Sequence, residues 1–138
     1  MLQPVSSETV PPLVIEGDFS EEECHAMQRA TLKLFEHWGL TDAEAVILLG
    51  GISLKTYRRW RAGEYGRVAR DLADRMSNML GIHKALRIIF KEPADGYRWI
   101  KAPNDAFAGK SAFDIMSAGA FTDILRVRRY LDSVRGGW

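Results

Sequence analysis

Few side chains in this sequence could carry out catalysis or hold a metal ion. The candidates are one cysteine and three histidines, Cys24, His25, His37 and His83. Cys24 and His25 directly follow three glutamates, and consecutive residues of a helix point in different directions, so this cluster cannot close around a metal ion. We therefore expect no catalytic site, no metal site and no cofactor. The chemistry predicted for this chain is binding.

The side chains that could bind a charged partner are concentrated in the middle of the chain. Residues 55–75 hold seven basic side chains against three acidic ones, whereas residues 1–45 hold nine acidic against two basic ones. The formal net charge of +1 conceals this separation. A local block of positive charge is typical of a surface that binds phosphate groups. Residues 55–75 therefore predict a nucleic-acid partner.

The basic block begins in a pattern of two short helices and a tight turn. A capping box of Thr41 with Glu44 starts a helix over residues 42–49, whose Ile47, Leu48 and Leu49 are expected to face inward. Gly50 and Gly51 turn the chain. Ser53 then caps a second helix over residues 54–62, which Gly63 ends. Two short helices joined by a glycine turn are the outline of a helix-turn-helix motif.

The second of these helices has an apolar side and a basic side. Leu54, Tyr57 and Trp60 are expected to hold it against the core, which turns the basic side outward. A recognition helix contacts DNA mainly through its N-terminal residues. The predicted DNA-binding residues are Ser53, Lys55, Thr56, Arg58 and Arg59. An ordinary helical bundle with a solvated basic face is the alternative interpretation. The stretch GGISLKTYRRWRAG resembles the helix-turn-helix of Xre-type, Cro-like proteins.

Helical periodicity and capping signals elsewhere predict an all-α protein of about seven or eight helices. Ser20 with Glu23 forms a capping box for a first helix that Gly39 ends. Pro93 is expected to break the helical pattern. Further helices are expected over residues 67–80 with Gly81 as the C-cap, over 83–90, around 97–100, over the stretch SAFDIMS that Ser111 and Asp114 cap, and over 120–133.

The expected domain order is an arm, a DNA-binding region and a second helical domain. Residues 1–19 contain Pro4, Pro11 and Pro12 without a helical period, which indicates an extended or mobile arm. Its Leu13–Ile15 stretch could pair as an edge strand or a dimer contact. Residues 20–81 hold the helix-turn-helix bundle, and residues 82–138 hold the second domain. No Gly/Ser-rich or Pro-rich spacer separates these two, so one helical core should join both.

The end of the sequence, LDSVRGGW, has an unusual composition for a surface. Gly136 and Gly137 provide a permissive C-cap and hinge after the last helix, and Trp138 has the largest apolar side chain. Two interpretations remain open. The segment folds back on its own domain, as chain ends often do, or it fills a pocket of a partner.

A longer pattern surrounds this segment. It combines a tryptophan, the motif PN-x-x-F-x-G-x-S, a DIM helix followed by a glycine, and VR-x-YLD-x-x-RGGW. These residues are Trp99, Pro103, Asn104, Phe107, Gly109, Ser111, Asp114, Met116, Gly119, Val127, Arg128, Tyr130, Leu131, Asp132, Arg135, Gly136, Gly137 and Trp138. The pattern resembles the toxin-binding domain of the MbcA/ParS/Xre antitoxin family.

That resemblance implies a bacterial type II antitoxin with a Cro/Xre-like helix-turn-helix bundle that merges into a small toxin-binding domain. The implied partners are a RES-domain toxin, which degrades NAD, and the operator DNA of the shared promoter, which the antitoxin represses. The implied toxin-binding residues are Arg128, Tyr130, Leu131, Arg135, Gly136, Gly137 and Trp138. Symmetric operators further favour a homodimer or a higher hetero-oligomer with the toxin.

The main rival function is a stand-alone helix-turn-helix repressor without a toxin partner, which would have no use for the RGGW segment. Two observations favour the cytoplasm for either function. A single cysteine cannot form an internal disulfide, and the sequence does not begin with a basic leader and an apolar run. No stretch approaches the roughly 20 apolar residues that a membrane span needs, so no membrane partner is expected.

Overall fold

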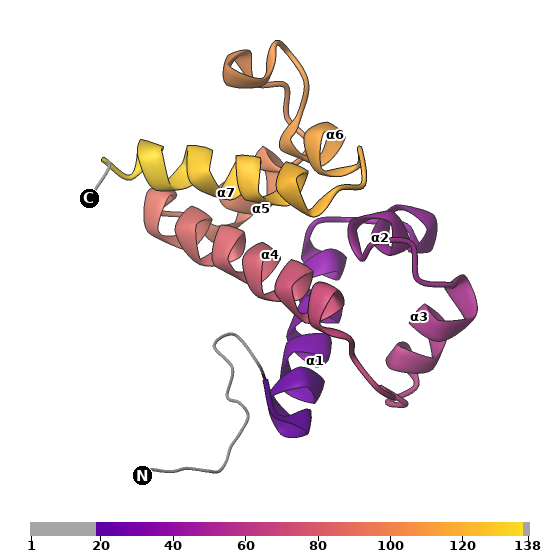
Figure 1. Ribbon diagram of the computed structural model, residues 1–138. Coiled ribbons are helices and arrows are strands. Elements are labelled where there is room, and N and C mark those ends of the chain that lie inside the picture. The colour runs from indigo at the N-terminus through magenta and orange to yellow at the C-terminus, as the bar shows by residue number, and fades with distance from the viewer. Residues whose placement is uncertain (1–18, 137–138) are drawn as a thin grey trace, which may run out of the picture.

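The computed structural model describes residues 19–136, which form seven α-helices and one 3-10 helix (Figure 1). The helices are α1 (Glu21–His37), α2 (Asp42–Leu48), α3 (Leu54–Arg61), α4 (Arg70–Ile89), α5 (Pro93–Trp99), η1 (Asp105–Phe107), α6 (Ala112–Met116) and α7 (Phe121–Val134). No strand occurs within this part of the chain, and the predicted all-α fold is confirmed. The contact expected of Leu13–Ile15 lies outside the described residues, as do Gly137 and Trp138.

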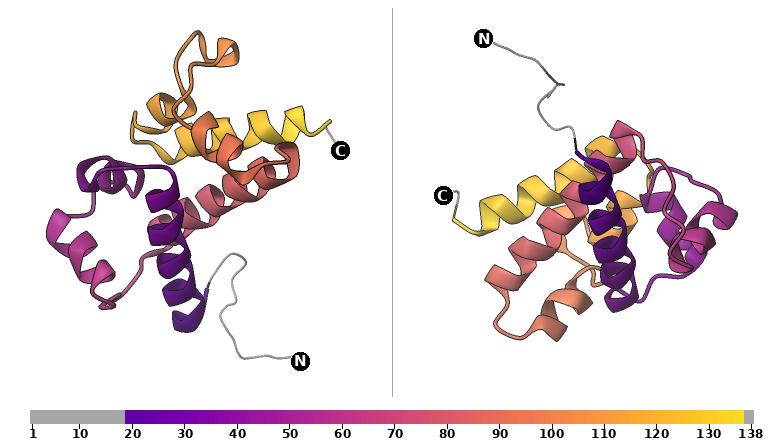
Figure 2. Two further views of the ribbon diagram at one scale, coloured as in Figure 1. Left: turned by 180° about the vertical axis from the view of Figure 1, so that it is seen from behind. Right: turned by 90° about the horizontal axis from the view of Figure 1, so that it is seen from below.

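The longest helix, α4, is the centre of the molecule. It packs against α1 on one side, against α7 along much of its length, and against α5 near its C-terminal end. The pair α2 and α3 lies at the far side of α1 from α7, and α6 packs against α7 (Figures 1 and 2). The first and the last helix therefore both pack on α4, which connects the predicted DNA-binding region to the second domain.

One hydrophobic core runs through both regions, as the absence of a spacer predicts. Its buried members come from every α-helix except the short α5, whose flanking Ile100 contributes instead; they include Leu34, Trp38, Leu48, Trp60, Met76, Ile82, Ile100, Met116, Ile124 and Leu131. Polar contacts also cross between the regions. Lys101 Nζ lies 3.1 Å from Glu44 Oε1, and the pKa of Glu44 is lowered by the Thr41 amide that it accepts from and by Lys101.

The helix starts follow the local capping rules. Ser20, Thr41 and Ser111 each accept a hydrogen bond from the amide of the third helical residue, and the carboxylate of that residue accepts from the cap amide. These capping boxes are confirmed at the predicted positions. Pro93, in contrast, begins α5 instead of only interrupting the pattern, because the first helical position needs no amide hydrogen bond.

The predicted break at Gly81 is wrong, since α4 is continuous from Arg70 to Ile89. The glycine has a packing role. A Cβ atom at Gly81 would lie 2.6 Å from Arg128 Cζ on α7, and Arg128 Nη1 donates a hydrogen bond of 2.8 Å to Asn78 Oδ1 on α4. Gly81 therefore allows α7 to cross α4 closely, at a helix-propensity cost of about 1 kcal/mol relative to alanine.

This explanation makes Gly81→Ala sensitive to its neighbour. In the otherwise unchanged chain the added methyl should displace Arg128 from Asn78 and lower the free energy of unfolding by about 1 kcal/mol, because a charged hydrogen bond contributes more than helix propensity returns. In an Arg128→Ala chain, Gly81→Ala should instead raise the free energy of unfolding, because only the gain in helix propensity remains. Urea unfolding of the four chains measures both differences. An equal effect of Gly81→Ala in both backgrounds would contradict the packing role.

Two apolar residues that were expected to face the core are exposed. Ile47 on α2 is 42% exposed and Leu54 at the start of α3 is 39% exposed. Both helices are short, and they reach the core through other residues, Leu48 and Leu49 for α2 and Tyr57 and Trp60 for α3. The inward face of each helix is thus narrower than the sequence pattern indicates.

Candidate functional site

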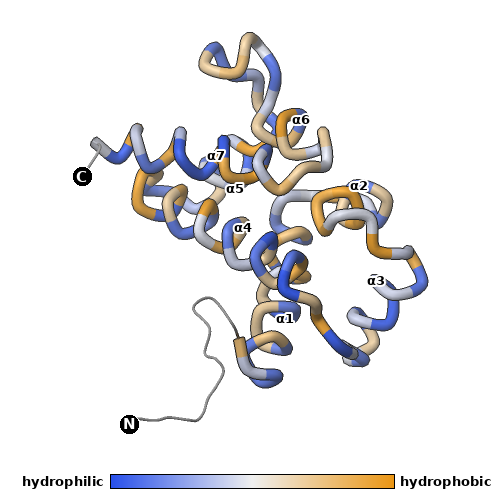
Figure 3. Tube along the Cα trace, viewed as in Figure 1, coloured by the Kyte–Doolittle hydropathy of each residue, from blue (hydrophilic) through white to orange (hydrophobic). Residues whose placement is uncertain are grey.

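The turn between α2 and α3 holds α3 at the edge of the molecule. Gly50 and Gly51 adopt φ angles of 85° and 89°, a region that suits glycine. Ser53 Oγ accepts a hydrogen bond of 3.0 Å from the Thr56 amide and caps α3. Figure 3 shows α3 as largely hydrophilic and α2 as largely hydrophobic. The helix is thereby anchored at its start and along one side only.

The inner side of α3 is anchored by two aromatic residues. Tyr57 is 3% exposed and Trp60 is 2% exposed, and their ring centroids lie 6.2 Å apart. Burial raises the pKa of the Tyr57 hydroxyl. Because these rings occupy the inner side, the opposite side of α3 is presented to solvent.

The five predicted DNA-binding residues lie on and beside this exposed side. Ser53, Lys55, Arg58 and Arg59 are exposed, and Thr56 is half-buried. The two hydroxyl groups are already engaged, since Ser53 Oγ donates to Thr56 Oγ1 at 2.9 Å. Within the described residues no acidic side chain pairs with Lys55 or Arg59. These two cations are free to meet an anionic partner.

The remaining arginines of α3 share one carboxylate. Arg58 Nε lies 3.6 Å from Asp42 Oδ2, and Arg61 hydrogen-bonds Asp42 Oδ1. The Arg61 guanidinium also lies over the Tyr57 ring, 5.3 Å from its centroid. Asp42 begins α2, so this carboxylate ties α3 to α2. The sequence analysis did not predict that Asp42 pairs with Arg58 and Arg61, although the sequence shows an acidic residue at the start of the helix that precedes the basic one.

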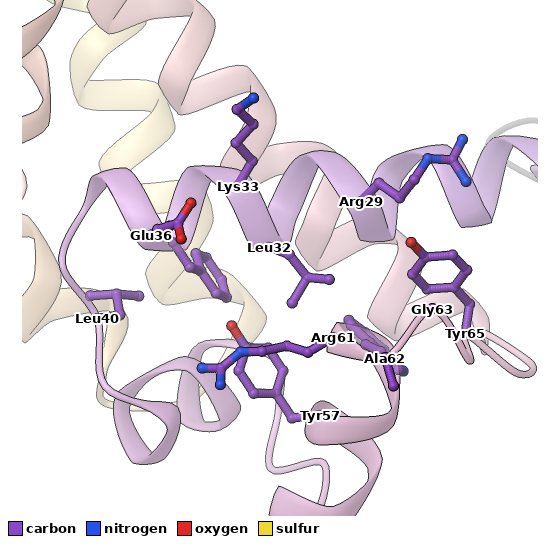
Figure 4. Close-up of a pocket in the computed structure, with 12 residues that line it drawn as sticks. Arg29, Leu32, Lys33, Glu36, Leu40, Tyr57, Arg61, Ala62, Gly63 and Tyr65 are labelled. Carbon is purple, nitrogen blue, oxygen red and sulfur yellow. The ribbon is translucent and has the colours of Figure 1, made fainter.

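A hollow of about 670 Å³ lies between α1 and α3 (Figure 4). Its floor contains Phe35, Tyr57 and Trp60, and Arg29 and Arg61 lie at its edge with Glu36 as the acidic residue. Figure 4 shows Leu32 pointing toward the space and Lys33 pointing away from it. Glu36 is the one acidic residue among those that line the hollow, and no histidine is among them.

The histidines are placed by packing. Tyr97 on α5 stacks against His37 at 4.5 Å and against His83 at 5.9 Å between centroids. Burial, together with Arg87 and His37, lowers the pKa of His83. Between residues 19 and 136 no three histidine, cysteine or acidic side chains are grouped as metal ligands would be. None of the described helices is long and apolar enough to cross a membrane.

At the other end of the molecule, α7 carries several of the expected toxin-binding residues, and its packing places two of them against the rest of the fold. Leu131 is 2% exposed and belongs to the core, so it offers almost no surface to a partner, and its role in toxin binding stays a prediction. A pairing of Arg128 with a partner's carboxylate stays a prediction, although Arg128 lies half-buried against α4 and donates a hydrogen bond to Asn78. The reason for this packing is periodicity, since Ile124, Val127 and Leu131 face α4 and Arg128 is adjacent to that face.

Tyr130 is half-buried in an aromatic cluster that the sequence did not reveal. Its ring stacks on Trp99 with centroids 6.3 Å apart and planes 6° apart, and it meets Phe107 edge-on at 5.1 Å. The three residues belong to α5, η1 and α7. The cluster therefore holds the η1 loop against α7, which is a structural role for Tyr130.

Two further residues of the predicted toxin-binding set follow the end of α7 within the described part of the chain. Arg135 is half-buried with Nη1 3.8 Å from Asp132 Oδ1, and Gly136 is exposed with a φ angle of 105°. A positive φ at this position redirects the chain away from the helix axis. Gly137 and Trp138 lie outside the described residues.

Comparisons with known proteins match two parts of the chain. The family model of the antitoxin Xre-like helix-turn-helix domain matches residues 25–81. The model of the antitoxin Xre/MbcA/ParS C-terminal toxin-binding domain matches residues 85–137. A protein of Sinorhizobium fredii, recorded as uncharacterized protein y4oB, is 42% identical over 110 residues, which cover 78% of this chain and 83% of that protein. The chain therefore belongs to the Xre/MbcA/ParS antitoxin family, as a non-enzymatic antitoxin of a toxin–antitoxin system with a helix-turn-helix domain and a toxin-binding domain.

Proposed function

We propose that this antitoxin is the inhibitor of a RES-domain enzyme that degrades NAD, within a type II system of the cytoplasm. Residues 135–138, the RGGW segment, lie in or near the active site of that enzyme when the complex forms. Residues 20–81 bind the operator of the shared promoter as a dimer or a larger complex with the toxin, and repress it. Residues 82–138 bind the toxin.

The observation that carries this proposal is the RGGW segment at the end of the rigid helix α7. A pocket that accepts NAD must admit flat rings and neutralise phosphates. The indole of Trp138 is a flat apolar ring, and Gly136 and Gly137 have no side chains to clash at a pocket mouth. Because α7 is held along α4, the helix that carries the segment loses little conformational entropy on docking. Arg135 would pair with carboxylates at the rim.

The test is co-expression with the product of the reading frame next to this gene. Expression of that product alone should stop growth and deplete cellular NAD, and co-expression of the antitoxin should restore both. The Arg58→Ala, Arg59→Ala chain should restore them equally, because toxin inhibition does not require DNA. If the neighbouring product leaves NAD unchanged, the RES assignment is wrong.

A second function, as a stand-alone repressor, is favoured only by the free cations Lys55 and Arg59 on α3. This second function makes a different prediction for repression, since repression by a stand-alone repressor would not depend on a toxin. Repression by the antitoxin alone and by its complex with the toxin should be compared in a promoter reporter. Repression that is identical with and without the toxin gene, together with no binding between the two proteins, would favour the stand-alone function.

The shared carboxylate Asp42 should limit how strongly α3 binds phosphate. Changing Asp42→Asn removes the ion pairs of Arg58 and Arg61, so affinity for unrelated duplex DNA should rise. About one more counterion should be released on binding, which makes the slope of log affinity against log salt concentration steeper by about one. Stability should fall by no more than about 1 kcal/mol, because exposed ion pairs contribute little. Fluorescence anisotropy at several salt concentrations measures this effect. Asp105→Asn, an exposed acid on η1, is the control, and equal salt slopes for both variants would exclude this role.

A further inference from the structure

Among the described residues, the large exposed hydrophobic side chains fall into two pairs. Ile47 and Leu54 flank the helix-turn-helix turn, and they are 42% and 39% exposed. Ile88 and Val134 are 53% and 46% exposed, and they lie at the C-terminal ends of α4 and α7. Exposed apolar residues that gather at one place often mark an interaction site. The second pair is not accounted for by the predicted toxin-binding residues.

The helices α4 and α7 run side by side in the same direction, so their C-terminal ends meet. Near the start of both helices, Arg75 Nη2 on α4 donates a hydrogen bond of 2.9 Å to the carbonyl of Gly119, which comes just before α7. Further along, Gly81 lies against Arg128. Figures 1 and 2 show the two C-terminal ends together, beside the point where the chain leaves α7.

Helical spacing places Ile88 and Val134 on the continuation of this packed seam. Ile88 follows Gly81 by about two helical turns, so it lies on the same side of α4 as the residue against which α7 packs. Val134 has the same relation to the buried Val127 on α7. Figure 3 shows the C-terminal end of α4 as strongly hydrophobic. The seam therefore continues beyond its last buried layer without a cover from the described chain.

Basic side chains outnumber acidic ones in the stretches around Ile88 and Val134. Within five positions of either residue, the basic residues are Lys84, Arg87, Lys91, Arg129 and Arg135, and the acidic ones are Glu92 and Asp132. Of the basic residues, only Arg135 is half-buried and paired, with Asp132 at 3.8 Å; the others are exposed. A partner that covers Ile88 and Val134 would best present an apolar centre with carboxylates around it.

We propose that the open end of the α4–α7 seam, centred on Ile88 and Val134, is the surface on which the toxin docks. This inference rests on the proposed function. Both residues lie within the stretch that matches the toxin-binding domain, and α7 ends, with the RGGW segment following it in sequence, at the same end. Docking here would therefore deliver that segment to the toxin, whereas Arg128, Tyr130 and Leu131 are engaged inside the antitoxin.

A second copy of this chain fits the surface less well. A symmetric contact places the same patch against itself, so the excess of basic residues in these stretches would face its own copy and repel it. Two exposed apolar residues are also a small centre for a stable homodimer, whose interfaces are typically large and more hydrophobic. A toxin surface with carboxylates avoids this repulsion.

The test compares single aspartate substitutions in the full-length chain. Ile88→Asp and Val134→Asp should each weaken binding to the neighbouring RES-domain enzyme by more than tenfold in calorimetric titrations. Ile47→Asp is the matched control, because Ile47 is an isoleucine of similar exposure on the helix-turn-helix pair, and it should bind that enzyme like the parent chain. Circular dichroism should show the same helicity for all the chains.

Each outcome has a distinct meaning. At saturating concentration the Ile88→Asp chain should still silence the enzyme, since its RGGW segment is intact. If Ile88→Asp binds like the parent chain, this docking surface is wrong although the proposed function stands. If the substitution instead converts a dimer of the free antitoxin to a monomer in sedimentation and leaves toxin affinity unchanged, a second copy covers the surface. If the parent chain itself does not bind the enzyme, the proposed function and this inference both fail.

Discussion

An antitoxin that lacks residues 135–138 is expected to bind its toxin and yet to leave it active. The docking surface remains, because α7 ends at Val134 and is held along α4 by core residues rather than by the RGGW segment. Affinity should fall by about 30-fold or more, since a buried aromatic anchor at an interface often contributes on the order of 2 kcal/mol. At concentrations that saturate the toxin, NAD should still be consumed.

The comparison that isolates the aromatic ring is Trp138→Ala in the full-length chain. It should reproduce most of the truncation, whereas Ser133→Ala on the exposed side of α7 should behave like the parent. Occupancy must be matched by calorimetry before NAD loss is measured. Complete silencing by the truncated chain at matched occupancy would show that the helices themselves block the enzyme, and the pocket-filling role of the segment would be abandoned.

The second large effect is expected on DNA. Changing Arg58 and Arg59 together to alanine should weaken binding to the promoter of the antitoxin gene. It should also reduce the slope of log affinity against log salt concentration by about two, because each lost phosphate contact means about one counterion fewer released on binding. Arg59 should account for more of the loss, since Arg58 already lies 3.6 Å from Asp42. Electrophoretic shifts across a salt series measure both quantities.

A matched control for this experiment is Arg87→Ala with Arg129→Ala, two exposed arginines on α4 and α7. That chain should bind the promoter like the parent, and the Arg58, Arg59 variant should inhibit the toxin like the parent. An unchanged salt slope for the Arg58, Arg59 variant would mean that α3 does not read DNA.

Features that depend on neighbouring residues could be predicted from the sequence. The capping boxes at Ser20, Thr41 and Ser111 need only two side chains three residues apart, and the glycine turn after α2 needs only its own φ angles. The all-α class and the order of the two regions follow from such local signals. Periodicity in the same way located α7 within a residue of its ends.

Features whose cause lies far along the chain could not be predicted. Gly81 resembles a helix end, but its function is to admit Arg128 from α7, and sequence spacing does not reveal that crossing. Leu131 and Arg128 match a toxin-binding motif, although the structure uses them to attach α7 to α4. A sequence motif includes residues that hold the domain together as well as residues that contact the partner. Only the burial of each side chain in the structure distinguishes the two kinds.

The exposed ends of the seam illustrate the same limit. Ile88 and Val134 have the residue types of core positions, and helical spacing places both on inward faces. They are exposed because the packed layers of α4 and α7 end before the helices do. Where a core stops depends on which other helices reach it, and that is a property of the assembled fold.

The central claim, that one end of this antitoxin occupies an NAD-degrading active site, is tested most directly by inhibition kinetics. Initial rates of NAD loss by the proposed RES-domain partner should be measured over a range of NAD concentrations at several fixed concentrations of the full-length antitoxin. The account predicts that a higher NAD concentration relieves inhibition, at least in part, because substrate and the RGGW segment compete for one pocket. Inhibition that is independent of NAD concentration would contradict it.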